Sequence, residues 1–384
     1  MLPLRQFACS WWSCLLNSRA PCVKTLVHGD QRRLFNTSNS RMTIMPAWVI
    51  DRYGSNDVLR FTKNAGFPII NYPNEVVVQV HAAGLNPIDV SMRGGYGAAT
   101  MAMKRDPLNI NQSGSEFPLI LGRDMSGVIM ECGLDVAPAY FKEGDEVSKK
   151  PKCLSHIEAA AVPYVAATAW SALVNTGGLN KDNCAKKRIL ILGGSGGVGT
   201  FSIQMLKAWG AHVTVTCSQN AERLVRGLGV DHVVDYTAGP VEVPLRALEK
   251  FDLVLDNVGG DTESWALGLL KPWCGAKYVT LVTPFLRNTD QLGIADGMLQ
   301  TGVTVASKAL KHLSKGVHYR WGMFAPNGLA LDDISEMVDA GKIRAVVEEE
   351  FTFSQVPQAM LKVEKGHARG KTVVKISSGE DSSE

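Results

Sequence analysis

Glycine fills five of the seven positions at 193–199, directly after the aliphatic run at 189–192. Gly194, Gly196 and Gly199 fit the spacing G-x-G-x-x-G. In that spacing the first glycine permits a tight turn, the second lets the backbone approach a pyrophosphate, and the third lets a helix pack closely on a strand. A plain glycine-rich turn is the alternative. Because the glycines follow an expected strand and precede an expected helix, we predict a dinucleotide-binding turn.

The segment after the next expected strand, at 212–217, favours a nucleotide that carries a 2′-phosphate. Enzymes that bind NAD usually place an Asp or Glu about twenty residues after the glycine turn, where it holds the ribose 2′-hydroxyl. Here Ser218 follows the strand and the first acid is Glu222, so no carboxylate is expected to repel a phosphate. Further candidates to hold that phosphate are Tyr236, Arg223 and Arg369. We predict NADPH, although Ser218 would equally suit a helix N-cap.

A parallel sheet is needed to bring these residues together. From about residue 159 the sequence alternates between helical patterns and short strands, with strands at 189–192, 212–217, 232–236, 252–259 and 276–282. This alternation predicts a doubly wound parallel sheet of the Rossmann type. From residue 45, by contrast, short runs rich in Val and Ile are separated by Gly, Pro and Asn, which predicts a compact β-rich domain. The fold class is therefore α/β.

The segment after about residue 320 is expected to form a helix, a strand, a helix and a strand. Its spacing does not continue the parallel sheet, so we place it back on the first domain. The expected organisation is a transit peptide at 1–41, a discontinuous β-rich catalytic domain at 42–164 and 321–376, a nucleotide-binding domain at 165–320 and a disordered polar tail at 377–384.

Composition excludes several classes of protein. A chain of 384 residues with 20% charged and 45% apolar residues is typical of a globular protein with room for two domains. The net charge of +3 does not suggest a nucleic-acid surface. No apolar run reaches the ~18 residues of a membrane span. The eight cysteines contain no C-x-x-C pair, so we expect reduced thiols and neither a disulfide framework nor a structural metal.

The first 41 residues have the composition of a mitochondrial transit peptide. They hold six basic residues and one acid, Asp30, and they are rich in Ser. A secretory signal is the alternative, because the apolar run at 7–16 follows Arg5. Basic residues continue for another twenty-five positions and no A-x-A cleavage site follows that run, so the mitochondrial address is favoured. Simple disorder is a third interpretation.

Five segments, in this order, resemble a known family: AAGLNPIDVSMRGGYG, FPLILGRDMSGVIMECG, GDEV, EAAAVPYVAATAWSAL and LGGSGGVG. The family is the zinc-free quinone oxidoreductase branch of the medium-chain dehydrogenase/reductase superfamily. The resemblance implies that the β-rich domain is GroES-like and that the chain binds NADPH. It also implies which residues contact that cofactor: Ser195, Gly197, Val198, Ser218, Tyr236, Asn257, Leu281, His367, Ala368 and Arg369.

Other segments, among them PAWVIDRYG, DNVGG and GHARGKTV, resemble one mitochondrial member of that branch more closely. The whole resemblance runs from about residue 45 to 376. It implies a mitochondrial location, in the matrix or in association with the outer membrane. It further implies a reticulon-family membrane protein as a partner, and relatives of this fold often pair into homodimers through their nucleotide domains.

Zinc-dependent relatives carry G-H-E where this chain has Gly122, Arg123 and Asp124, and they carry a four-cysteine lobe that is absent here. Zinc activation of an alcohol is therefore not expected. A quinone or enone accepts hydride readily and needs little beyond alignment and a hydrogen bond to its carbonyl oxygen. We predict that Asn86 donates this hydrogen bond and that Tyr96 is a second donor or a lid. Alternatively, Asn86 only ties down the backbone before a proline.

The sequence departs from the family after Gly144–Val147. Relatives continue there with further strands, whereas this chain passes directly to SKKPKCLSH, so roughly twenty residues are missing, about the span of two or three strands. We expect the first domain to lose strand pairing and the nucleotide domain to be unaffected.

Two functions remain open at this point. The first is an NADPH-dependent reductase of a quinone or enone, with ubiquinone-type rings as a natural acceptor in mitochondria. The second is a nucleotide-binding interaction protein, with a reticulon as partner, that has lost turnover. A metal-dependent alcohol dehydrogenase is a third and would require zinc in the purified protein.

Overall fold

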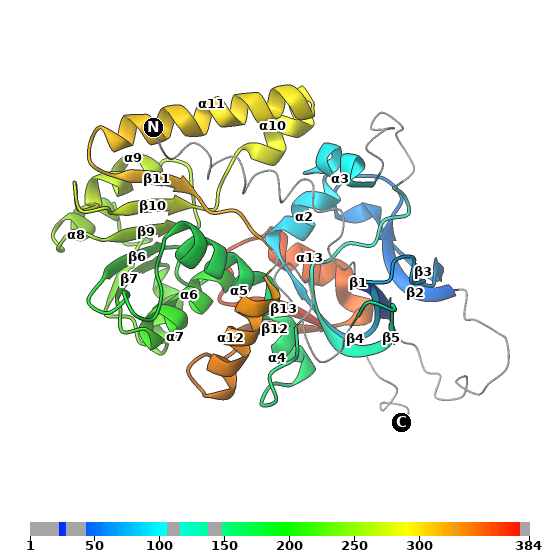
Figure 1. Cartoon of the computed structure of the whole chain (residues 1–384). Coiled ribbons are helices and arrows are strands. Elements are labelled where there is room, and N and C mark those ends of the chain that lie inside the picture. The colour runs from blue at the N-terminus through cyan, green and yellow to red at the C-terminus, as the bar shows by residue number, and fades with distance from the viewer. Residues whose placement is uncertain (1–22, 28–43, 106–115, 137–147, 326, 377–384) are drawn as a thin grey trace.

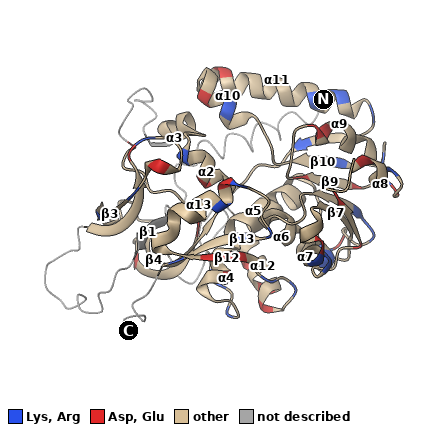
Figure 2. Cartoon of the chain, turned by 180° about the vertical axis from the view of Figure 1, so that it is seen from behind, with Lys and Arg blue, Asp and Glu red and all other residues tan. Residues whose placement is uncertain are grey.

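Two sheets organise the chain (Figure 1). The structure is a computed structural model that describes residues 23–27, 44–105, 116–136, 148–325 and 327–376. Acidic and basic residues are interspersed over the helices and strands that belong to each of the two sheets (Figure 2). None of the helices in the described ranges is long and apolar enough to cross a lipid bilayer.

The larger sheet has six parallel strands in the order β11-β10-β9-β6-β7-β8. The strands are β6 (Arg188–Leu192), β7 (His212–Cys217), β8 (His232–Asp235), β9 (Leu253–Asp256), β10 (Lys277–Thr280) and β11 (His318–Trp321). The chain thus runs outward from β6 to one edge and then returns to fill the other side. This order confirms the predicted doubly wound sheet, with its topological switch between β6 and β9.

Helices cover both faces of this sheet (Figure 1). They are α5 (Pro163–Trp170), α6 (Gly197–Ala208), α7 (Glu222–Arg226), α8 (Glu242–Arg246), α9 (Thr262–Ala266), α10 (Phe285–Leu292), α11 (Ile294–Leu313) and α12 (Gly328–Asp339). Because side chains alternate along a strand, Ile189 and Ile191 join the core under α5 and α6, whereas Leu190 and Leu192 join the core on the opposite face.

The smaller sheet is built on the long strand β4 (Val76–Leu85). Its partners are β5 (Asp124–Cys132), β13 (Lys371–Lys375) and, beyond β13, β12 (Val347–Thr352). A separate hairpin pairs β2 (Ile44–Ile50) with β3 (Leu59–Gly66). The helices of this part are α2 (Pro87–Arg93), α3 (Ala98–Arg105), α4 (His156–Ala160) and α13 (Val356–Glu364). The last strand of the chain therefore lies beside β4, nearly 300 residues away in sequence.

Two details differ from the sequence-based expectation. The helix expected at 159–175 is divided into α4, α5 and a wide turn at Ser171–Thr176, because Pro163 lacks an N–H and begins a new helix. The segment placed on the first domain, 321–376, also begins too early. Trp321 completes β11, and Ile334 and Val338 of α12 pack in the core of the larger sheet.

The strand β1 (Val23–Val27) lies within the expected transit peptide and pairs in parallel with Val76–Val80 of β4. The rest of that peptide, the polar tail and the residues just before the expected gap lie outside the described residues. On the other side of β4, the strand β5 pairs with β4 alone among the described strands. Its Val128 and Met130 are 48% and 40% exposed, a high value for apolar strand residues.

Candidate active site and nucleotide-binding site

The glycine turn connects β6 to α6 at the carboxyl edge of the parallel sheet. Gly193 carries the positive φ, +77°, so the tight turn depends on this residue rather than on Gly194. A Cβ on Gly194 would lie 2.7 Å from Val215, and one on Gly199 would lie 2.4 Å from the Gly193 oxygen. Gly194 and Gly199 are therefore needed because their neighbours pack too closely to leave room for a Cβ. Gly196 has no atom within 4 Å of its Cβ position and is the one open to a ligand.

Asn257 lies across the switch point from this turn. It follows β9, and its backbone N–H donates to the Leu192 oxygen at 3.3 Å, which brings it beside the end of β6. Both polar atoms of its side-chain amide are buried and have no hydrogen-bond partner among the described residues. A buried amide that lacks partners is costly unless a ligand satisfies it. The turn and Asn257 together fit a dinucleotide, as the sequence predicts.

Ser218 and Tyr236 follow adjacent strands, and the Tyr236 N–H donates to the Cys217 oxygen at 3.0 Å. The Ser218 hydroxyl donates to Asn220 Oδ1 at 2.6 Å and does not cap the helical turn that follows. Sequence reasoning missed one carboxylate here. Asp235 accepts hydrogen bonds from Thr237 and from the Gln219 backbone, which lower its pKa. It comes from the neighbouring strand, so the spacing after the glycine turn does not reveal it.

The returning segment reaches the glycine turn. Gly370 forms a parallel bridge with Gly196, which brings Arg369, Ala368 and His367 beside the turn. His367 has a φ of +56°. The Arg369 guanidinium, which was expected to supply charge to a 2′-phosphate, instead pairs with Glu348 at 3.3 Å. Leu281 follows β10, and its N–H donates to the Asp256 oxygen at 3.0 Å.

Asn86 is not the free hydrogen-bond donor that the sequence suggested. Its amide is 2% exposed: Nδ2 donates to Asp124 Oδ2 at 2.9 Å, and Oδ1 accepts from Lys371 Nζ at 2.5 Å. Lys371 also donates to Asp124 Oδ2 at 2.8 Å and to the Leu85 oxygen at 2.9 Å. The side-chain amide of Asn86 is therefore engaged in a buried hydrogen-bond network. This arrangement is close to the alternative interpretation, in which Asn86 only holds the backbone in place. Sequence reasoning missed the role of Lys371, which lies 285 residues from Asn86.

Asp89 lies beside this network, in the first turn of α2. Its Oδ2 accepts from the Asn86 backbone N–H at 2.8 Å, while Oδ1 is buried without a partner among the described residues. Removal from water destabilises the charged form, and the nearby Asp124 carboxylate adds to this effect. Burial thus raises the pKa of Asp89 to about 6.

Tyr96 lies where the two parts of the chain meet. The next residues, Gly97 and Ala99, donate their backbone N–H groups to the Asp290 carboxylate of α10 at 2.7 and 3.1 Å. Burial and the charge of Asp290 raise the pKa of Tyr96. The half-buried Tyr96 therefore belongs to a contact between α3 and α10, which join the smaller sheet to the larger one.

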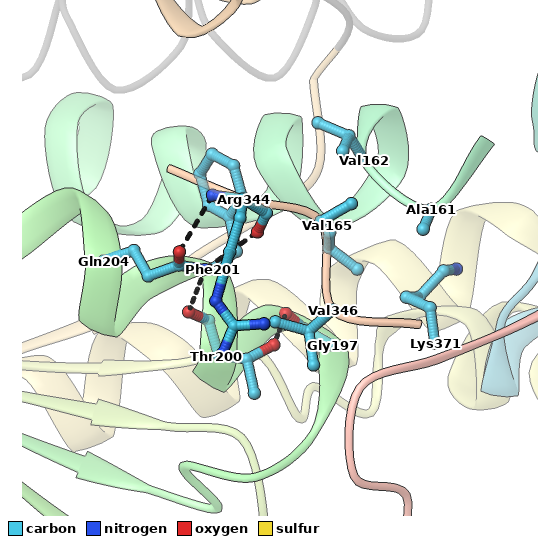
Figure 3. Close-up of a pocket in the computed structure, with 11 residues that line it drawn as sticks. Ala161, Val162, Val165, Gly197, Thr200, Phe201, Gln204, Arg344, Val346 and Lys371 are labelled. Atoms are coloured by element: carbon cyan, nitrogen blue, oxygen red, sulfur yellow. Dashed lines mark hydrogen bonds between the residues drawn. The ribbon is translucent and has the colours of Figure 1, made fainter. Parts of the chain in front are cut away.

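Figure 3 shows a small cavity between the two parts. It is lined by α5 and α6 on one side and by Arg344, Val346 and Lys371 on the other. Gln204 closes it by accepting from the Arg344 N–H at 2.9 Å and donating to the Arg344 oxygen at 3.0 Å. Its volume is about 10 Å³, enough for one water molecule but not for a substrate.

Comparison with known proteins places this geometry in a family. A family model described as Alcohol dehydrogenase GroES-like domain matches residues 72–199, and one described as Zinc-binding dehydrogenase matches 228–374. A Danio rerio protein named NAD(P)H oxidoreductase RTN4IP1, mitochondrial, is 73% identical over 90% of this chain and 94% of its own length. The Homo sapiens protein of that name is 62% identical over 90% and 92%. This chain belongs to the RTN4IP1 family of medium-chain dehydrogenases/reductases.

The solved structures agree with this assignment. The quinone oxidoreductase from Coxiella burnetii superposes with a TM-score of 0.68 at 25% identity, over 87% of this chain and 100% of that chain. The predicted combination of a Rossmann-type sheet with a GroES-like domain is confirmed by the family models and by this likeness.

The alignment with the Danio rerio member of this family also bears on the expected gap. It runs over 367 positions, whereas 90% of this 384-residue chain supplies only about 346 of them. About twenty positions of that relative therefore have no counterpart here. This number is close to the roughly twenty residues that are expected to be missing after Val147, which itself lies outside the described residues.

The donor set does not fit the zinc ion that one family description names. No group of three His, Cys, Asp or Glu side chains in the described ranges is arranged to hold a metal. Asp124 stands where the zinc-dependent relatives carry the acid of their G-H-E motif, but its Oδ2 already accepts from the Lys371 ammonium. A divalent cation at that oxygen would be repelled by the buried lysine.

Proposed function

We propose that this chain reduces a quinone or enone with hydride from NADPH. Membership of the RTN4IP1 family makes it an NAD(P)H oxidoreductase. The observation that supports the acceptor class is the set of side chains where the two sheets meet, which in the described ranges includes tyrosine hydroxyls and no group of three side chains arranged to hold a metal. Acceptors that need no Lewis acid suit such a site.

The chain's own residues would bind the cofactor at the switch point. The N–H groups at the start of α6 would face the pyrophosphate, and the open side of Gly196 would allow its approach. Asn257 would satisfy its amide on the ligand, and Ser218 with Tyr236 would hold the 2′-phosphate. When bound, NADPH supplies a hydride. The protein's part is to align the acceptor and to stabilise the negative charge that develops on its oxygen.

A second candidate function is supported by a relative's name. A Caenorhabditis elegans protein, 34% identical over 90% of this chain and 98% of its own length, is named Reticulon-4-interacting protein 1, mitochondrial. A reticulon partner is therefore proposed for this chain as well. Partner binding is compatible with turnover. It becomes the sole function only if NADPH binds without being consumed.

The test separates binding from turnover. Purified protein is mixed with NADPH and a small quinone, and the absorbance of the reduced nicotinamide is followed while the dissociation constant is measured separately. Gly196→Ala should weaken NADPH binding at least tenfold without loss of folding, because its Cβ meets no protein atom. Gly268→Ala, also unobstructed but remote from the turn, is the matched control. Consumption by the wild type supports the reductase, and binding without consumption contradicts it.

The protein is mitochondrial, as the members of its family are named. We further propose import into the matrix, with association with the outer membrane as the alternative, and ubiquinone-type rings as the natural acceptor. A reporter fused to residues 1–41 should reach mitochondria, and the mature chain should begin near residues 42–45. Recovery of the intact N-terminus from mitochondria would contradict cleavage.

A further inference from the structure

Tyr164 lies at the junction of the two sheets. It is the second residue of α5, and its backbone N–H donates to Asp124 Oδ1 at 2.6 Å, which fixes the start of α5 against β5. Its ring stacks on Phe324 with centroids 4.8 Å apart and planes 17° apart. Phe324 follows β11, at the carboxyl edge of the parallel sheet where the nucleotide site lies. Tyr164 is therefore held at its backbone by Asp124 and at its ring by Phe324.

The Tyr164 hydroxyl has no hydrogen-bond partner among the described residues. The two fully buried tyrosines in the described ranges differ: Tyr278 donates to Asp256, and Tyr319 donates to Glu263. The hydroxyl of Tyr164 interacts electrostatically with Arg123, Asp89, Asp124 and Tyr96, which are the residues around the expected acceptor site. A partly buried phenol between these charges, with its donor free, is suited to a ligand that presents an oxygen.

We propose that the Tyr164 hydroxyl donates a hydrogen bond to the carbonyl oxygen of the acceptor, the role that the sequence assigned to Asn86. This inference rests on the proposed function. Hydride transfer brings two electrons and one hydrogen to the acceptor and leaves negative charge on its oxygen. The Tyr164 O–H stabilises that charge in the transition state, and water then supplies the proton that completes the hydroquinone or the saturated ketone.

Tyr164 keeps its own proton in this step. Burial is the largest cause that raises its pKa, to about 12, above the value of about 10 for an ordinary phenol. Tyr164 therefore stays protonated throughout the neutral range, where it acts as a hydrogen-bond donor, and the proton that completes the product comes from solvent. The rate should therefore show no ionisation of Tyr164 between about pH 6 and 10, in contrast to a general acid matched to neutral pH.

The decisive variant is Tyr164→Phe, which keeps the ring and its stack on Phe324 but removes the hydroxyl. We expect kcat to fall about a hundred- to a thousandfold, a loss typical of removing one such donor. The NADPH dissociation constant and the melting temperature should stay at wild-type values. Tyr72→Phe, on a loop and 65% exposed, is the matched control and should retain full kcat.

A second measurement does not depend on turnover. In protein with isotope-labelled tyrosine and no NADPH, the resonance that disappears in Tyr164→Phe should shift when a quinone is titrated. Wild-type kcat in Tyr164→Phe, or a Tyr164 resonance that does not respond to the quinone, would overturn this inference and leave the reductase function intact. A wild-type chain that consumes NADPH with no quinone or enone would overturn both.

Discussion

Lys371 connects segments of the smaller sheet that lie far apart in the sequence. Its ammonium has three donor hydrogens and meets three acceptors, the Leu85 oxygen, Asn86 Oδ1 and Asp124 Oδ2. A buried charge is tolerated only when it is paired and fully hydrogen-bonded, and this condition is met here. The network fixes the start of α2 relative to β5. Asp124 then fixes the start of α5 through the Tyr164 N–H.

Asp89 provides a pH-dependent test of this region. Its folded pKa of about 6 exceeds the ordinary aspartate value of 3.8, so the folded state binds more protons between these values. Stability therefore decreases as pH rises from about 4 to 6, and the full cost of the buried charge, about 3 kcal/mol, is present above about pH 7. Asp89→Asn should be more stable than wild type at pH 8 and equal to it near pH 4.

Chemical denaturation of both proteins across this pH range measures the difference. Asp235→Asn serves as the control, because the pKa of that half-buried carboxylate is lowered rather than raised. A constant difference between Asp89→Asn and wild type at all pH values would contradict the assignment.

We propose that the choice between NADPH and NADH is decided at a single residue, Ser218. Ser218→Asp places a carboxylate beside the position expected for the 2′-phosphate, so NADPH affinity should fall at least tenfold while NADH affinity is maintained or rises. Calorimetric titration with both nucleotides measures this change. Ser218→Ala, which lacks the charge, should lose much less. Equal affinities of the wild type for NADPH and NADH would contradict the 2′-phosphate site.

At the scale of elements, Asp290 of α10 acts as an N-cap for α3. α10 lies with the larger sheet, whereas α3 belongs to the smaller one. The Asp290 carboxylate accepts hydrogen bonds from the backbone N–H groups of Gly97 and Ala99. Asp290→Ala should cost about 0.5–2 kcal/mol, the range for loss of an N-cap. Limited proteolysis should then cleave α3 faster. Asp333→Ala, an exposed carboxylate on α12, should change neither stability nor cleavage. Unchanged cleavage of α3 in the Asp290 variant would contradict the capping role.

The elements that the sequence predicts well are those with local signals. The strand 189–192, the glycine turn and the helix after it follow from residues within twenty positions of one another, and the structure contains all three. The division at Pro163 also has a local cause, but the apolar pattern continues through it and hides the break. Asn86 was misassigned because its partners Asp124 and Lys371 lie 38 and 285 residues away. The spacing of residues along the sequence does not reveal contacts between residues so far apart.

At the scale of the whole molecule, we expect the smaller sheet to lack strands that its family contains, because about twenty positions of the Danio rerio relative have no counterpart here. Inserting the corresponding segment of the Danio rerio relative after Val147 should cover β5, with its exposed Val128 and Met130, and raise the melting temperature. Quinone turnover should rise with it, while NADPH affinity stays constant because the larger sheet is intact. A Gly/Ser linker of equal length is the control. Equal melting and equal turnover of the original and restored chains would show that the segment is dispensable.

The position of β13 has a consequence for biogenesis. This strand contains Lys371 and lies between β4 and β12, yet among the described strands it is the last to be synthesised and the last to cross a membrane during N-terminus-first import. The larger sheet is complete once β11 has emerged, so it can form while β4 still lacks this neighbour. Until residue 375 arrives, that strand edge and the buried Asp124 remain exposed. The importing organelle must therefore shield a half-finished sheet from aggregation.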